Sequence, residues 1–76
     1  MIERRWPPDK VIATHTHDFD VEALLTEGEM WLSHGGQTLH LRAGDRFALG
    51  RDVAHDERYG AQGTALWVAR RRPSRG

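Results

Sequence analysis

Regularly spaced glycines are the feature that most constrains the fold of this chain. They cut the middle of the sequence into short segments of β-strand length. Their positions are Gly28, Gly35, Gly36, Gly44, Gly50, Gly60 and Gly63. Only Val21–Leu32 approaches the apolar period of a helix, and Gly28 inside this window disfavours one. The pattern therefore predicts an all-β domain.

The segments between the glycines have the side chains of strands. Gln37–Arg42 alternates polar and apolar residues, as a half-buried strand does, and the Gly35-Gly36 pair before it predicts a tight hairpin turn. A second hairpin is expected at Gly60. The expected apolar interior consists of Met30, Leu32, Leu39, Leu41, Phe47, Leu49, Leu66 and Val68.

Length and composition limit what such a domain can do. Seventy-six residues leave room for one domain, so any function depends on a single site. Eleven basic residues balance eleven acidic ones, which argues against nucleic acid or a membrane surface as a partner. Because the chain has no cysteine, a metal or a second subunit is the expected source of extra stability, and the expected location is the cytoplasm.

Histidines and one glutamate form the candidate site. His15 and His17 are two positions apart, a spacing that puts both imidazoles on one face of a strand. Glu22 follows closely, and a closed barrel is the kind of fold that returns the distant His55 to the same interior. Imidazoles with a carboxylate suit one divalent transition metal (Fe, Mn, Ni, Zn, Co or Cu) better than Ca or Mg. A His-Thr-His triplet also arises by chance, so the residues around it decide whether a metal site is predicted.

Two separated motifs of the chain resemble those of the cupin superfamily. His15, His17 and Glu22, followed by Gly28, resemble the first cupin motif, in which two histidines, a glutamate and a glycine recur at this spacing. Gly44–His55 is similar to the second motif, which opens with Gly-Asp and closes with the fourth ligand histidine.

The resemblance implies a minimal single-domain cupin, a jelly-roll-like β-barrel with the metal inside. Mapped onto this chain, the metal ligands are His15, His17, Glu22 and His55. The barrel would cover about residues 11–70, after a lead at 1–10 and before a basic tail at 71–76. In the second motif, Gly50, Asp52 and Ala54 replace the usual proline, glycine and proline, which puts the conformation of that loop in question.

Glu57 is the candidate for a catalytic group. In a strand over His55–Tyr59, Glu57 shares a face with both ends, so it would line the metal cavity as a general base or as a partner of a ligand imidazole. The alternative is a solvated glutamate at the barrel rim. His34 and His40 lie outside the motifs and receive no role.

Two tryptophans predict a homodimer. Trp31 and Trp67 would face outward if their neighbours face inward, and exposed tryptophans often mark interfaces. The alternative is that a terminal segment carrying Trp6 covers them. The arginines at 70–72 and Arg75 are expected to form a solvated tail rather than a phosphate site.

The cupin resemblance leaves the function open, because this fold serves enzymes and binding proteins alike. One hypothesis is a metal-dependent enzyme of dioxygenase, isomerase or lyase type that acts on a small polar or acidic metabolite. The other is a non-catalytic binding or sensing module with a structural metal. The shortness of the chain leaves little material for a lid, which favours the second hypothesis.

Overall fold

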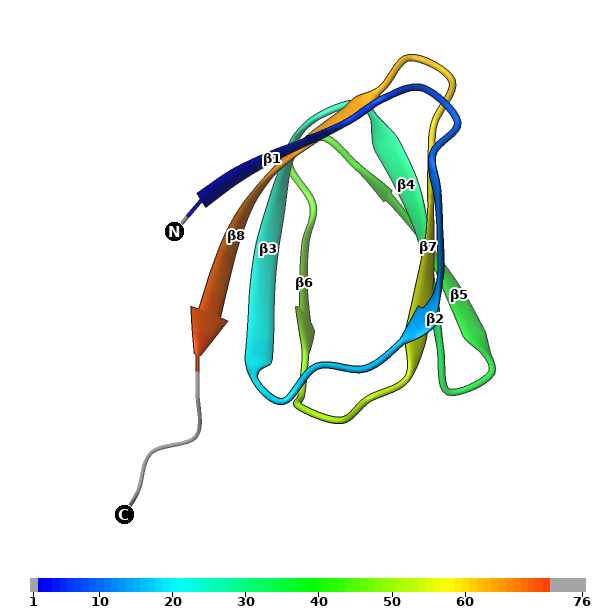
Figure 1. The fold of residues 1–76 in the computed structure, drawn as a ribbon. Helices are drawn as coiled ribbons and strands as arrows, with labels where there is room; N and C mark the ends of the chain where they lie inside the picture. Colours follow the sequence, from blue (N-terminus) through cyan, green and yellow to red (C-terminus); the bar gives the residue numbers. More distant parts are fainter. Residues whose placement is uncertain (1, 72–76) are drawn as a thin grey trace.

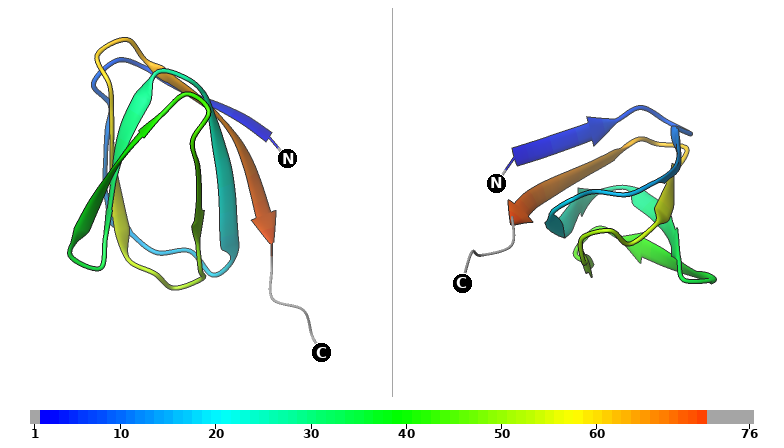
Figure 2. Two further views of the ribbon diagram at one scale, coloured as in Figure 1. Left: turned by 180° about the vertical axis from the view of Figure 1, so that it is seen from behind. Right: turned by 60° about the horizontal axis from the view of Figure 1, so that its bottom comes forward.

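The structure, a computed structural model, describes residues 2–71 as two antiparallel sheets that face each other (Figure 1, Figure 2). The strands are β1 (Ile2–Trp6), β2 (Val11–His15), β3 (Asp20–Glu27), β4 (Glu29–His34), β5 (Gln37–Arg42), β6 (Arg46–Leu49), β7 (His55–Tyr59) and β8 (Thr64–Arg71). Their orders are β1-β8-β3-β6 and β2-β7-β4-β5. The predicted all-β class is confirmed, and residues 2–71 contain no helix that is long and apolar enough to cross a membrane.

The closed barrel of the prediction is corrected to two separate sheets. The chain turns from one sheet into the other at Gly28, a single residue between β3 and β4 with a φ of 77°. A β-carbon at Gly28 would lie 2.1 Å from the carbonyl oxygen of Gly63, so only glycine fits this corner. Among residues 2–71, the ladders of the two sheets end at β1 and β6 and at β2 and β5, so the sheets do not pair at their edges.

The first residues form a strand instead of the predicted lead. β1 pairs with β8 along its whole length, from Ile2 opposite Val68 to Trp6 opposite Thr64. The Trp6 ring stacks on Tyr59 of the facing sheet, with ring centroids 5.4 Å apart. The predicted tail beyond Arg71 lies outside the described residues.

The hydrophobic core fills the space between the sheets. Its fully buried side chains include Leu25, Met30, Leu32 and Tyr59. These positions alternate along their strands with outward-facing residues, as the pleat requires. Leu39 departs from the predicted interior, because it is 38% exposed on β5 at the free edge of its sheet.

Candidate metal centre

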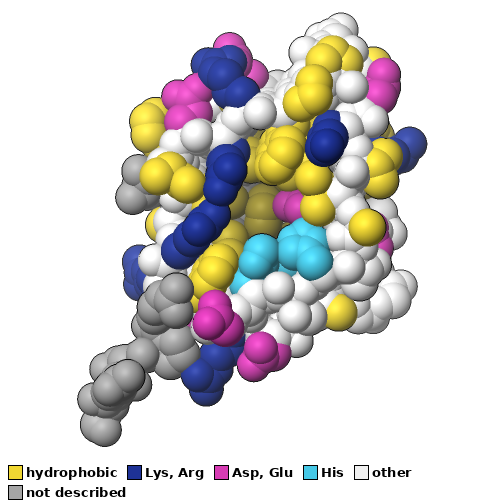
Figure 3. Space-filling model, viewed as in Figure 1, with side chains coloured by type: hydrophobic (Ala, Val, Ile, Leu, Met, Phe, Trp, Pro, Cys, Tyr) yellow, Lys and Arg dark blue, Asp and Glu magenta, His cyan; other side chains and the backbone are white. Residues whose placement is uncertain are grey.

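Three histidines meet at one end of the space between the sheets. His15 is the last residue of β2, His55 is the first residue of β7, and the two are direct partners in the register. His17 follows in the loop after β2, and one ring nitrogen from each of the three histidines lies within 4.8 Å of the others. Figure 3 shows the histidine side chains at a hollow between the sheets that has hydrophobic walls. The structure thus brings together three of the four predicted ligands.

Backbone contacts orient two of these imidazoles. The Nδ1 atoms of His15 and His55 lie 2.7 Å and 2.9 Å from the carbonyl oxygens of Ala13 and Val53. A carbonyl oxygen only accepts hydrogen bonds, so each Nδ1 carries a proton. In the neutral imidazole, the Nε2 atom then keeps the lone pair that a metal can bind. This arrangement is the usual preparation of a metal-ligating histidine.

The spacing of the nitrogens suits a common metal ion. The Nε2 atoms of His15 and His17 are 3.1 Å apart. Two nitrogens that bind one ion at ~2.1 Å, with an angle of about 90–110° between the bonds, are themselves about 3.0–3.4 Å apart. In the absence of an ion, one of the two must donate a hydrogen bond to the other. The pair of His15 and His17 therefore has the spacing that the predicted borderline divalent metals require. The three nitrogens together lie within 4.8 Å of one another, so the rings must move closer to bind one ion at ~2.1 Å.

The environment of His17 favours its neutral form. Burial lowers the pKa of His17 below its usual value of 6.5, and His15 and His55 beside it lower the pKa further. Glu57 opposes this shift, while Arg70 adds to it. A neutral imidazole is the form that binds a metal.

The loop before His55 is tied to the loop that carries His17. The backbone N–H of Asp52 donates to the carbonyl oxygen of His17 at 2.7 Å, and that of Arg51 donates to Asp20 Oδ1 at 2.9 Å. Asp52 has a φ of 61°, in the left-handed region, which aspartate tolerates better than most residues. Asp52, which replaces the usual glycine, therefore adopts a conformation that glycine takes easily. The loop of the altered second motif still places His55 beside His15 and His17.

Glu22, the fourth predicted ligand, is not brought to the histidines. Its neighbours Val21 and Ala23 pair with Leu49 and Phe47 on the inner side of the sheet, so Glu22 points to the outer side. There its Oε2 atom lies 3.6 Å from Arg71 Nη2, and the side chain is 56% exposed. Because successive residues of a strand face opposite sides of the sheet, a shift of one residue in the register of β3 would turn Glu22 to the inner side.

Glu57, the predicted catalytic residue, lies on the inner side of β7. The Tyr59 hydroxyl donates to Glu57 Oε1 at 3.0 Å. Burial and the neighbouring Glu57 raise the pKa of Tyr59 well above its usual range, so this tyrosine stays protonated and remains a donor. Glu57 is close enough to His17 to influence its pKa.

The sequence analysis missed an aromatic and basic wall beside His17. The Phe19 ring stacks on His17, with centroids 4.8 Å apart, and the Arg70 guanidinium lies 5.1 Å from the Phe19 ring centroid. Arg70 pairs with Val21, and Arg4 pairs with the buried Leu66, so both arginines are on the inner side of their sheet. The available signal was the alternation of β8, in which Arg70 follows Leu66 and Val68 at intervals of two.

Three solved structures with a similar fold are named as cupins. A cupin superfamily protein from Desulfitobacterium hafniense DCB-2 is similar with a TM-score of 0.83 and 13% identity, over 93% of this chain and 64% of that one. The cupin domain of Schizosaccharomyces pombe Cnp3 has a TM-score of 0.86 and 10% identity, over 93% of this chain and 53% of that one. An RmlC-like cupin from Shewanella frigidimarina NCIMB 400 has a TM-score of 0.79 and 23% identity, over 96% of this chain and 64% of that one.

The chain therefore has the cupin fold, in a small form with two four-stranded sheets. It spans between 53% and 64% of the length of these three structures. No family model and no curated protein matches the sequence. The similarity thus supports the fold, and the function must be argued from the site.

Proposed function

We propose that this chain binds one divalent transition metal ion through His15, His17 and His55. The observation that carries the proposal is the convergence of their ring nitrogens within 4.8 Å, with two of the rings oriented by backbone carbonyls. Three protein ligands leave coordination positions open, which is typical of sites that act on a ligand rather than of closed structural sites. When bound, the metal would polarise an oxygen atom of that ligand.

The charges around the hollow favour a small anionic ligand. Arg70 and Arg4 lie on the inner side of the β1-β8-β3-β6 sheet, and no ion pair with an acidic group of residues 2–71 is formed by either. Figure 3 shows basic side chains on this side of the hollow, opposite the histidines. A molecule with a carboxylate or phosphate group could contact a guanidinium at one end and the metal at the other.

Catalysis is the second candidate function, and Glu57 is the observation in its favour. Its carboxylate lies on the inner face near His17, and the hydrogen bond from Tyr59 holds it in place. A carboxylate in this position can accept a proton from a bound ligand. Reactions of dioxygenase, isomerase or lyase type would use such a base. The rival is a non-catalytic binding or sensing module, in which Glu57 only orients the site.

Metal analysis and dioxygen uptake test both parts of the proposal. Protein purified without added metal is analysed for its elements, and the Fe(II)-reconstituted protein is then assayed for dioxygen uptake with a panel of small carboxylic acids. We expect close to one metal per chain, and uptake that Glu57→Gln abolishes without loss of metal. Full metal occupancy in a His15→Ala/His55→Ala variant would sink the metal assignment, while ligand binding without turnover would favour the binding module.

A further inference from the structure

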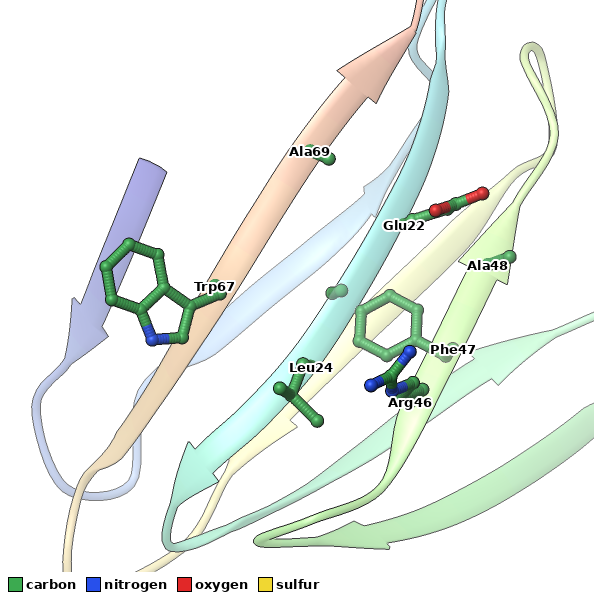
Figure 4. A pocket seen from close by; sticks show the side chains of 8 residues that line it. Glu22, Leu24, Arg46, Phe47, Ala48, Trp67 and Ala69 are labelled. Carbon is green, nitrogen blue, oxygen red and sulfur yellow. The ribbon is translucent and has the colours of Figure 1, made fainter. Parts of the chain in front are cut away.

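The outer face of the β1-β8-β3-β6 sheet carries a row of side chains with opposite charges at its two ends. Across the sheet, Glu3 lies opposite Trp67, Trp67 opposite Leu24, and Leu24 opposite Arg46. The row faces outward, because the residues that flank it along the strands, such as Leu66 and Leu25, are buried in the core. Figure 4 shows Trp67, Leu24 and Arg46 in turn on β8, β3 and β6.

The centre of this row is apolar and open. Trp67 is 40% exposed, and a groove of about 690 Å³ lies along it. In the next row of the same face, the groove is lined by Ala48 and Ala69, with the Glu22 side chain between them. An indole exposed on a strand beside a leucine and two alanines is an apolar surface that water covers poorly.

The two ends of the row differ in charge. At the β1 edge, Glu3 and Glu27 share a single arginine, Arg5, at 2.5 Å and 2.8 Å, so the group has an excess negative charge. At the β6 edge, Arg46 forms no ion pair with an acidic side chain of residues 2–71. From β1 to β6, the row therefore consists of an acidic residue, two apolar residues and a basic residue.

We infer that this face binds a second copy of the chain, across a twofold axis that lies in the interface parallel to the strands. Such an axis reverses the order of the strands in the copy while it keeps them aligned, as in packed sheets. Glu3 then faces Arg46 of the copy, and Trp67 faces Leu24 of the copy. Each contact occurs twice, so the charges and the apolar centre are complementary in one arrangement. The inference is independent of the metal and of the proposed function.

The other tryptophan of the dimer prediction is covered within its own chain. Trp31 lies on the outer face of the β2-β7-β4-β5 sheet, where His40 stacks on it with ring centroids 4.7 Å apart. The Arg58 guanidinium lies 4.3 Å from the centroid of the Trp31 ring. The inferred interface therefore uses Trp67 and leaves Trp31 outside.

The size of the face predicts a weak dimer. A four-stranded face with strands of this length covers roughly 400 Å² on each copy, which is small for a specific interface. We therefore expect dissociation in the micromolar range. Pairing through an edge strand is the alternative, because β1, β6, β2 and β5 all have a free edge.

Sedimentation velocity of the full chain, from low to high micromolar concentration, tests the inference. The wild-type protein should pass from monomer to dimer, and Arg46→Glu should raise the dissociation constant at least about tenfold, because it puts two acidic contacts in each dimer. Adding Glu3→Arg to Arg46→Glu should restore the dimer, since the reversed charges again meet. Both residues are exposed, so neither substitution threatens the fold.

Matched variants of the two tryptophans separate this face from the other one. Trp67→Ser should abolish the dimer, and Trp31→Ser should leave it intact. A wild-type mass of one chain at all concentrations would overturn the inference. So would a dimer that persists in Arg46→Glu, or assemblies that keep growing with concentration, which edge pairing would produce.

Discussion

The hydrogen bond between Tyr59 and Glu57 connects the hydrophobic core to the candidate metal centre, and removing it tests how the two are coupled. Tyr59 is 1% exposed, and its hydroxyl donates to Glu57 Oε1 at 3.0 Å. A hydrogen bond to a charged group contributes about 1.5–3 kcal/mol to stability. Because Glu57 is only half-buried, water replaces part of the lost contact. Tyr59→Phe should therefore lower the free energy of unfolding by about 1.5 kcal/mol, the lower end of that range.

A double-mutant cycle isolates this contact from the packing of the ring. Tyr59→Phe is measured in the wild-type protein and in Glu57→Ala, by urea unfolding with tryptophan fluorescence as the signal. Trp6 is a suitable reporter because it stacks on Tyr59. A chelator is present throughout, since a bound metal would add its own stability.

In the Glu57→Ala background, the hydroxyl has lost its acceptor, so its removal should be nearly neutral. The expected coupling free energy is about 1–1.5 kcal/mol. Equal effects of Tyr59→Phe in both backgrounds, with a coupling below about 0.3 kcal/mol, would refute the claim that this bond holds the Glu57 carboxylate in place.

Three further predictions concern the fold and the protonation of the site. In the metal-free protein, the free energy of unfolding should fall as the pH drops below 6.5, because the pKa of His17 is lowered in the folded state and the unfolded chain binds the proton first. Unfolding measured at several pH values should show this dependence, and His17→Gln should weaken it. Gly28→Ala should lower the melting temperature far more than Gly35→Ala, because a β-carbon would lie 2.1 Å from Gly63 O at the first position and meets nothing within 4 Å at the second; equal shifts would contradict the corner geometry. Trp6→Phe should lower the free energy of unfolding in urea by less than about 1 kcal/mol, because the Trp6 Nε1 donor is buried without a partner among the described residues. A loss near that of Trp6→Ala (~3 kcal/mol) would show that the donor is satisfied.

Much of the fold was predictable because it depends on local signals. The glycines mark the turns, and the hairpin at Gly35 and Gly36 joins β4 to β5 as expected. The hairpin expected at Gly60 is wrong, because β7 and β8, on either side of that turn, lie in different sheets. The closure of the barrel was not predictable in this way, because it depends on whether edge strands pair over long distances. The pairing of β1 with β8 is of the same kind, since Ile2 and Val68 are at opposite ends of the sequence.

The candidate site was predicted where spacing alone decides, and missed where register decides. The short interval between His15 and His17 keeps both imidazoles at one end of β2, although β2 ends at His15 and His17 lies in the loop that follows. The orientation of Glu22 depends on which residues of β3 pair inward with β6, and this register is a tertiary property. Arg70 was missed for a different reason: the sequence analysis assigned it to a solvated tail, although its interval of two residues from Val68 places it on the inner face of β8.

Calorimetric titration of the metal-free protein with Co(II) tests the central claim most directly, that three histidines and not Glu22 form the site. We expect one ion per chain in the wild-type protein, in Glu22→Ala, and in the outer-face control His40→Ala, with affinities within about threefold of one another, whereas His55→Ala should lose at least about a hundredfold. A loss in Glu22→Ala as large as that in His55→Ala would contradict the claim and would place the carboxylate among the ligands.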